Sequence, residues 1–349
     1  LFDTNTEIEK YGEPTPGDIG STASSNLAMG QYHSCAIFDD GSVKCWGRNN
    51  HGQLGDGTNT DSITPVAVDI TAGRTASALA LGSSHSCAIL DDDSVMCWGR
   101  NNNGQLGDGT NTNSNTPVAV SLPVGRTATA IELGSSHSCA ILDDASTMCW
   151  GYNNLGQLGN GNTTDMYTPV AVNIPAGRTA AALALGDYQS CAILDNDAVS
   201  CWGGGSYGQL GNGQTFDYAN PTYSNVVNVK SIMITSGGDS TCVLLDNGTA
   251  MCWGYNYYGQ LGDGTTTNQL SPVLIDFTFD YVQIYASYQH SCAILDDGSA
   301  MCWGDNYNGQ LGDGTNADST TPVAVNLPVG RTVANLTLGH LHSCAILDD

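Results

Sequence analysis

The chain has 349 residues, with 34 Asp and Glu against 9 Lys and Arg and a formal net charge of −25. Because a phosphate backbone is bound through clustered Lys and Arg, this composition argues against a nucleic acid partner. No apolar run reaches about eighteen residues, so we expect no membrane insertion.

The first segment, residues 1–26, lacks the motifs found in the rest of the chain and is interrupted by Pro14 and Pro16. We expect it to be an N-terminal arm or linker. The chain starts at Leu1 without a charged-then-apolar leader, as expected of a processed secreted protein or of a fragment of one.

From residue 27 onward, one phrase returns along the chain: a Ser/Thr-Cys pair, an aliphatic stretch and an acidic turn, followed by Cys-Trp-Gly in every copy except the last. The first cysteines of the copies are Cys35, Cys87, Cys139, Cys191, Cys242, Cys292 and Cys344, at spacings of 50 to 52 residues. Such a period is typical of propellers and solenoids, whose units stack on one another to share a core. We therefore predict a single domain over residues 27–349.

Residues 78–120 illustrate one unit. Segments 78–82, 86–90, 95–99 and 116–120 read as strands, with an acidic hairpin turn at 91–94 and a polar, Gly-rich loop at 100–115. The alternation has a period of two, which excludes a solenoid of helix pairs. Four strands per unit predict the blade of an all-β propeller.

The thirteen cysteines all lie in the repeat. Within each complete copy the two cysteines flank the hairpin turn ten positions apart, which places them directly opposite each other, with Cβ atoms about 4.5–5.5 Å apart. This separation suits a disulfide. The predicted pairs are Cys35–Cys45, Cys87–Cys97, Cys139–Cys149, Cys191–Cys201, Cys242–Cys252 and Cys292–Cys302. The alternative is a reduced, buried cysteine at each position. Because such disulfides persist in oxidising compartments, they favour a secreted, extracellular or cell-surface protein.

The repeat also carries a family resemblance. Leu-Gly-x-x-His-Ser-Cys-Ala-Ile-Leu, Trp-Gly, Asn-x-x-Gly-Gln-Leu-Gly-x-Gly and Pro-Val together resemble the regulator of chromosome condensation repeat over residues 27–349. The resemblance implies a seven-bladed β-propeller of about 50-residue, four-stranded blades, closed by pairing between the chain ends. Two features depart from the family: paired cysteines are not general in it, and its chromatin-binding member is basic.

The seventh copy ends inside its hairpin before any Cys-Trp-Gly, so the seventh blade is incomplete in this chain and Cys344 has no partner ten positions on. One explanation is a fragment whose remainder completes the blade. The other is that a second molecule supplies the missing strands, which would build a filament or surface assembly.

Two side chains recur at fixed places in the repeat. Arg74, Arg126, Arg178 and Arg331 belong to the links between blades, where we expect each to bind a hairpin carboxylate or carbonyl. His33, His85, His137, His290 and His342 precede the first cysteine, and we expect hydrogen bonds to local backbone rather than metal binding, because they lie on separate blades.

Other residues are weighed as ligands. Asp56, Asn59 and Asp61 offer oxygens for calcium, but such Asx-rich loops are ordinary turn formers, so we expect no cofactor. The tryptophans of Cys-Trp-Gly are expected to pack between blades. The sequons at Asn162, Asn247 and Asn335 are candidate glycosylation sites.

The fourth and fifth copies depart from the repeat pattern through additional aromatic residues. Phe216, Tyr218, Tyr255, Tyr257 and Tyr258 are therefore the candidate partner-binding residues. No catalytic motif is present, neither a Gly-x-Ser-x-Gly elbow nor a phosphate loop nor His-Glu-x-x-His, so we expect no enzyme.

The leading functional hypothesis is a non-catalytic extracellular structural or interaction protein, a disulfide-stapled platform that binds a protein partner or assembles with itself. The alternative is a regulatory protein-binding propeller, either a secreted inhibitor or a guanine-nucleotide exchange factor.

Overall fold

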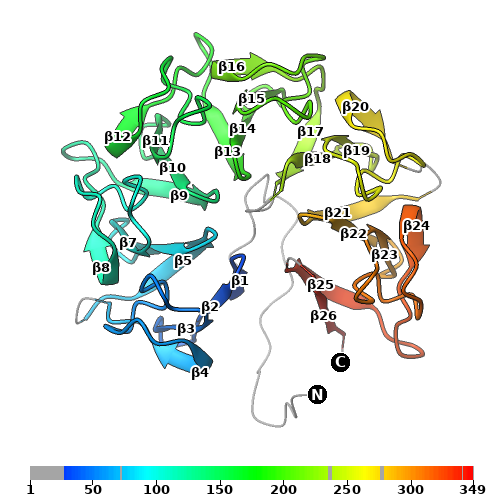
Figure 1. The fold of residues 1–349 in the computed structure, drawn as a ribbon, viewed down its shortest axis with the longest axis horizontal. Helices are drawn as coiled ribbons and strands as arrows, with labels where there is room; N and C mark the ends of the chain where they lie inside the picture. The colour runs from blue at the N-terminus through cyan, green and yellow to red at the C-terminus, as the bar shows by residue number, and fades with distance from the viewer. Residues whose placement is uncertain (1–26, 71–72, 235–237, 276–278, 340, 349) are drawn as a thin grey trace.

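The computed structural model describes residues 27–70, 73–234, 238–275, 279–339 and 341–348. The predicted arm, residues 1–26, lies outside the described residues. The described chain contains strands and no helix, and these strands form six four-stranded antiparallel sheets and one two-stranded sheet arranged as a ring (Figure 1). The predicted all-β, seven-bladed propeller with an incomplete seventh blade is confirmed.

Within each blade, the first strand in the chain lies nearest the centre of the ring and the following strands lie progressively further out. The innermost strands are β1 (Leu27–Met29), β5 (Ala76–Leu81), β9 (Ala128–Leu133), β13 (Ala180–Leu185), β17 (Val229–Met233), β21 (Tyr281–Ala286) and β25 (Val333–Leu338). The second strands are β2 (His33–Ile37), β6 (His85–Leu90), β10 (His137–Leu142), β14 (Gln189–Leu194), β18 (Ser240–Leu245), β22 (His290–Leu295) and β26 (Ser343–Leu347).

The outer half of each blade follows in the same order. The third strands are β3 (Val43–Gly47), β7 (Val95–Gly99), β11 (Thr147–Gly151), β15 (Val199–Gly203), β19 (Ala250–Gly254) and β23 (Ala300–Gly304). The outermost strands are β4 (Ser62–Ala67), β8 (Ser114–Ala119), β12 (Met166–Ala171), β16 (Tyr218–Tyr223), β20 (Gln269–Leu274) and β24 (Ser319–Ala324). In the unit taken as the example, the expected strands match β5 to β8 to within two residues at each end.

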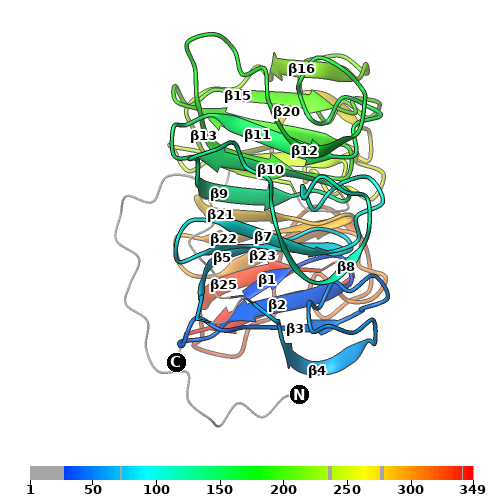
Figure 2. The same ribbon diagram turned by 90° about the vertical axis from the view of Figure 1, so that its left-hand side faces the viewer.

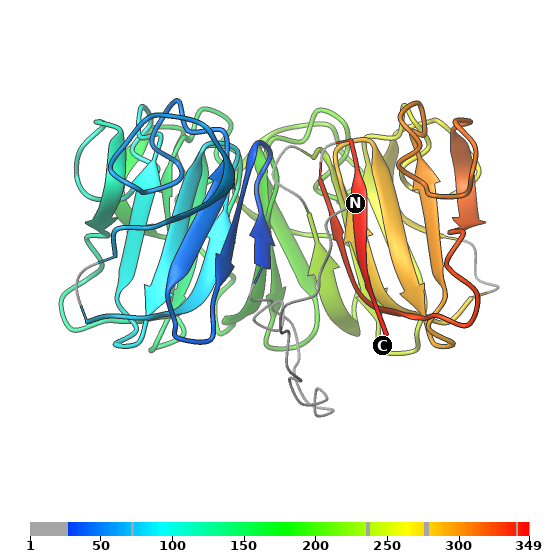
Figure 3. The ribbon, with the colours of Figure 1, turned by 90° about the horizontal axis from the view of Figure 1, so that it is seen from below.

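The strands run between the two faces of a disc, which Figures 2 and 3 show edge-on. One face carries the turns between first and second strands and the long loops between third and fourth strands; we call it the loop face. The other carries the hairpins between second and third strands and the links between blades; we call it the hairpin face.

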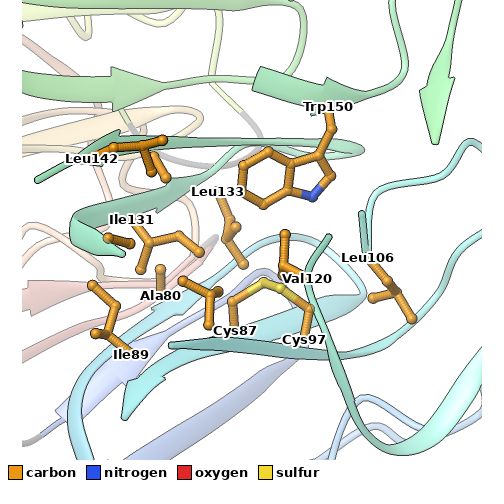
Figure 4. Packing of buried hydrophobic residues seen from close by; sticks show 13 residues of the cluster. Ala80, Cys87, Ile89, Cys97, Leu106, Val120, Ile131, Leu133, Leu142 and Trp150 are labelled. Atoms are coloured by element: carbon orange, nitrogen blue, oxygen red, sulfur yellow. A yellow bond between two sulfur atoms is a disulfide. The ribbon is translucent and has the colours of Figure 1, made fainter. Parts of the chain in front are cut away.

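The core lies between neighbouring blades. In the cluster between blades two and three, Trp150 from β11 packs with Leu106, Val120 and the Cys87–Cys97 disulfide of the preceding blade (Figure 4). Five tryptophans of Cys-Trp-Gly are fully buried, as expected, namely Trp98, Trp150, Trp202, Trp253 and Trp303. Trp46 of blade one is only half-buried, because its neighbour, blade seven, has two described strands.

The paired cysteines oppose each other as the hairpin register predicts. Cys87 is the direct partner of Cys97 across β6 and β7, and the other five pairs repeat this register. The structure contains six disulfides, Cys35–Cys45, Cys87–Cys97, Cys139–Cys149, Cys191–Cys201, Cys242–Cys252 and Cys292–Cys302. Cys344 on β26 is exposed and is not part of a disulfide.

Blades seven and one meet where the ring closes. Thr337 on β25 donates a hydrogen bond to the sulfur of Met29 on β1, at 3.0 Å. Within the described residues, β26 pairs with β25 alone, and the strand pairing between chain ends that the resemblance implies is not seen.

Candidate functional site

A hydrogen-bond network on the loop face joins each blade to the next. The main-chain carbonyl of Gln53, from the Gly-Gln-Leu-Gly loop of blade one, accepts hydrogen bonds from Ser86 Oγ at 2.9 Å and from Trp98 Nε1 at 3.0 Å, both in blade two. The carbonyls of Gln105, Gln157, Gln209 and Gln260 play the same part in the following blades. The recurring Gly-Gln-Leu-Gly motif therefore fixes the position of each loop relative to the next blade.

The recurring histidines extend this network. His85 Nε2 lies 3.0 Å from Ser138 Oγ of the next blade, and His33, His137 and His290 contact Ser86, Ser190 and Ser343 in the same way. Since the single hydroxyl proton of Ser138 is donated to the Gln105 carbonyl, the histidine must carry its proton on Nε2 and donate it. The expectation of local backbone bonding was wrong, because the side chain reaches across the blade interface.

Burial keeps these imidazoles neutral. It lowers the pKa of His33, His85 and His137 from 6.5 to about 3. A neutral imidazole with its proton on Nε2 can make this contact.

Blades four and five depart from the pattern. Gln189 replaces the histidine in blade four and donates to the Gly238 carbonyl of blade five at 3.1 Å. Ser240 replaces it in blade five, and its buried hydroxyl has no hydrogen-bond partner among the described residues. The departures coincide with the aromatic segments.

Tyrosine side chains from several blades gather on the loop face beside these departures. The Tyr255 ring lies 5.0 Å from that of Tyr207, and the Tyr257 ring lies 5.1 Å from that of Tyr258, measured between centroids. The Tyr188 ring lies 6.4 Å from that of Tyr152. We define the tyrosine surface by these members together with Tyr288 and two carboxylates: Tyr152, Tyr188, Tyr207, Tyr255, Tyr257, Tyr258, Tyr288, Asp187 and Asp239.

The tyrosine surface is open to solvent at its rings. Tyr188 is 42% exposed, Tyr207 41% and Tyr257 67%. Tyrosines with exposed rings and a polar hydroxyl supply large contact area with little loss of side-chain freedom, which makes them frequent anchors of protein interfaces. This is the most distinctive chemical surface of the described residues.

The two carboxylates give the tyrosine surface its charge. Burial, and next the neighbouring Asp187, raise the pKa of Asp239 to about 6, although Gln209 donates a hydrogen bond to Asp239 Oδ1 at 3.3 Å. Residues 187–318 contain a single cation, Lys230, on β17 at the hairpin end of the strand. This part of the chain is therefore strongly acidic.

The five predicted partner-binding residues are placed differently. Tyr255, Tyr257 and Tyr258 belong to the tyrosine surface. Phe216 is 64% exposed in the loop of blade four, and Tyr218 is half-buried in the outermost strand β16, packed on the core between blades four and five. Within the described residues, no ring contact joins these two to the surface.

Six members were missed, namely Tyr152, Tyr188, Tyr207, Tyr288, Asp187 and Asp239. Position-by-position alignment of the repeats provides the signal that was overlooked: Tyr188 stands where blades two and three have Ser84 and Ser136.

An asparagine side chain holds the polar loop of blade one through several hydrogen bonds. Asn49 Nδ2 donates to Asp56 Oδ1 and to the carbonyls of Thr58 and Thr60, and the Asn49 main-chain N–H donates to Asp61 Oδ1. Asn59 Oδ1 accepts from Asn115 of the next blade. The three oxygens considered for calcium are thus hydrogen-bond acceptors within the fold. In the part of the chain that the structure describes, no group of three or more His, Cys, Asp or Glu is arranged to hold a metal.

The hairpin face is organised by ion pairs. Arg126 contacts Asp143 at 3.3 Å and Asp144 at 3.0 Å, and Arg74, Arg178 and Arg331 contact the matching hairpin carboxylates. The predicted structural role of these arginines is confirmed.

The three candidate glycosylation sites differ in exposure. Asn162 is exposed on the loop face, Asn247 is exposed in a hairpin turn, and Asn335 is half-buried in β25. Across the described residues, no helix is long and apolar enough to cross a membrane.

Comparison with known proteins identifies the repeat. The family model "Regulator of chromosome condensation (RCC1) repeat" matches residues 40–89, 92–141, 148–193, 196–244, 247–294 and 297–346. The chain belongs to this family. Its similarity to the regulator of chromosome condensation repeat, and the disulfide pairs that set it apart, are both present in the structure.

Relatives with this repeat have varied roles. The chain is 32% identical over 270 residues to the ultraviolet-B receptor UVR8 of Arabidopsis thaliana, covering 76% of this chain and 61% of that protein. It is 28% identical over 300 residues to the human E3 ubiquitin-protein ligase HERC2, covering 79% of this chain and 6% of that protein. The chain therefore spans less than two thirds of the length of these relatives.

Solved structures support the fold. Human WBSCR16 superposes with a TM-score of 0.80 at 21% identity, covering 97% of this chain and 89% of that chain. Yeast RCC1 (Prp20), solved with Kap60 bound, gives 0.79 at 19% identity, covering 91% and 78%.

Proposed function

We propose that this protein is a non-catalytic, exported binding scaffold that uses the tyrosine surface to hold a protein partner. The observation that carries this proposal is the gathering of exposed tyrosine rings on one face of a rigid ring. Aromatic anchors of this kind dominate the binding energy of protein interfaces.

The scaffold supports the proposal because it presents the surface rigidly. The loop that carries Tyr255, Tyr257 and Tyr258 is fixed by the hydrogen bonds of Asn256, whose Nδ2 donates to Asp263 Oδ1 at 3.1 Å and whose Oδ1 accepts from the Leu261 N–H at 3.0 Å. Preorganised aromatic side chains lose less entropy on binding than mobile ones.

The proposed compartment rests on the disulfides. Six bridges in one chain are sustained where the environment is oxidising. Non-reducing peptide mass spectrometry of the natural protein, with free thiols alkylated, tests this: we expect six peptides cross-linked at a spacing of ten residues. Free thiols on most of the thirteen cysteines would place the protein in a reducing compartment. They would favour the alternative hypothesis of a regulatory protein-binding propeller.

The binding role is tested by photocross-linking. Tyr257→p-benzoylphenylalanine places the probe on the tyrosine surface, and Val124→p-benzoylphenylalanine places it at a fully exposed site on the hairpin face. Each variant is irradiated in an extract of the natural source of the protein. We expect the first variant to form a cross-link to one discrete protein and the second to form none. Equal labelling from both positions, or none from Tyr257, would contradict the proposal.

A further inference from the structure

Blade one contains an aromatic contact that blade four lacks. The Arg48 guanidinium lies over the Tyr32 ring, 5.2 Å from its centroid, and the Arg48 N–H donates to the Tyr32 carbonyl at 3.0 Å. In blade four, Gly204 and Tyr188 occupy these two positions. The Gly204 N–H donates to the Tyr188 carbonyl at 2.8 Å, so the backbone arrangement is the same. Only the arginine side chain is missing.

The Tyr188 ring is partly exposed to solvent, as the Tyr32 ring is. Tyr188 is 42% exposed, and a Cβ built on Gly204 would lie 3.0 Å from Tyr188 Cβ, so a side chain at this position would run along the tyrosine. Gly204 does not have the left-handed backbone conformation that excludes other residues. A Cβ there would also lie 3.1 Å from Leu155 Cδ1, so a larger residue requires the Leu155 side chain to shift by a few tenths of an ångström.

The surroundings of Tyr188 complement a cation. Asp187 precedes Tyr188 in the same turn, and its main-chain N–H donates to the carbonyl of Gly238, beside Asp239 in the corresponding turn of blade five, at 3.4 Å. Burial, and next Asp187, raise the pKa of Tyr188, and Asp239 adds to this effect. Blades one and two carry Arg48 and Arg100 directly after Trp-Gly, whereas Tyr152, Gly204, Tyr255 and Asp305 follow it in blades three to six. Blades three to six thus have no cation at the position where blades one and two have an arginine.

Resting on the proposed function, we infer that the tyrosine surface binds an arginine of its protein partner, which stacks on Tyr188 in the space above Gly204 and pairs with the carboxylates of Asp187 and Asp239. Blade one provides the template within the same chain. A guanidinium suits the site better than an ammonium, because its plane stacks on the ring while its N–H groups reach the carboxylates.

The first test places the arginine in the chain itself. Gly204→Arg is expected to fill the site as Arg48 does in blade one, and Asn102→Arg adds the same charge at an exposed position of the loop face in blade two. The probe is a fluorescein-labelled Gly/Ser peptide with two arginines, followed by fluorescence anisotropy. We expect Gly204→Arg to weaken binding at least tenfold and Asn102→Arg to change it less than twofold.

Two further comparisons separate the site from general charge attraction. Asp187→Asn with Asp239→Asn is expected to weaken binding at least tenfold, whereas Asp296→Asn with Asp297→Asn, which removes two charges from the hairpin face, leaves it within twofold. A peptide with lysine in place of arginine is expected to bind several-fold more weakly. Equal losses from both double variants, or unchanged binding by Gly204→Arg, would overturn the inference.

The cross-linking experiment distinguishes this inference from the proposed function. If Tyr257→p-benzoylphenylalanine captures a partner and the added Gly204→Arg leaves the yield unchanged, the arginine site is wrong and the binding role stands. If no partner is captured although the peptide binds as expected, the binding role fails and the arginine site stands.

Discussion

His85 Nε2 lies 3.0 Å from Ser138 Oγ in the following blade, and both groups are fully buried. The contact repeats at three more interfaces, so the ring is held by side chains that each belong to two blades. Replacing one member leaves a buried polar group without its partner, which makes the contact measurable.

We expect His85→Ala to lower the free energy of unfolding by about 1–3 kcal/mol, the cost of leaving a buried donor or acceptor unpaired. His85→Gln is the matched control, because Gln189 shows that this side chain reaches the next blade. Its loss should be smaller. Chemical denaturation followed by tryptophan fluorescence gives both values, and identical stability of His85→Ala and the parent would contradict the role assigned to the contact.

The buried histidines predict a loss of stability in acid. Burial lowers the pKa of His33, His85 and His137 to about 3, so between about pH 3 and pH 6.5 the unfolded chain binds protons that the folded chain does not. Stability therefore rises with pH across this window and falls as the solution is acidified. Melting temperatures measured from pH 7 to pH 4 should show this slope, and His85→Gln should reduce it. A slope unchanged by that substitution would count against the assignment.

Glu132 predicts the opposite dependence. It lies on β9 opposite Cys139, and burial raises its pKa from 4.5 to about 7. Between these values the folded state keeps a proton that the unfolded state releases, so this group's contribution to stability falls as the pH rises through the window. Ala80 and Ala184 occupy the same place in the neighbouring blades.

Glu132→Gln, which keeps the shape but cannot ionise, should therefore raise the melting temperature at pH 8 and leave it nearly unchanged at pH 4. An equal effect at both pH values would show that the carboxylate charge is not the cause.

A single disulfide should be worth about 2–3 kcal/mol, because it closes a loop of about ten residues in the unfolded chain. We expect the double substitution Cys87→Ser with Cys97→Ser to lower the free energy of unfolding by that amount. Cys344→Ser, at an exposed and unbridged position, should leave the stability of the monomer unchanged. Urea denaturation of the parent and the two variants measures these free energies. Equal stability of the double variant and the parent would contradict the contribution assigned to the disulfide.

Much of the fold follows from local patterns. The cysteine spacing and the acidic turn determine which residues oppose each other in a hairpin, so Cys87 opposite Cys97 and the Arg126 contacts with Asp143 and Asp144 follow from one repeat read by itself. These contacts join residues within one blade or across a short link.

Contacts between blades could not be predicted in the same way. The partner of His85 is 53 residues away, and its choice depends on the angle and height at which two blades pack. The tyrosine surface has the same origin: Tyr188, Tyr207 and Tyr255 are separated by whole strands in sequence, and only the ring brings their loops together. Phe216 is also aromatic, but it lies in a different part of its loop and has no ring contact with the tyrosine surface among the described residues.

All six disulfides are contained within single hairpins, so the main chain is the only covalent path from one bridged blade to the next. A protease cut in the link at residues 122–126 therefore yields two pieces that separate in denaturant without any reductant. A cut in the hairpin turn at residues 91–94 leaves the pieces joined through Cys87 and Cys97. Electrophoresis without reductant thus distinguishes the two kinds of nick, and a nicked but active ring would owe its integrity to the buried contacts between blades.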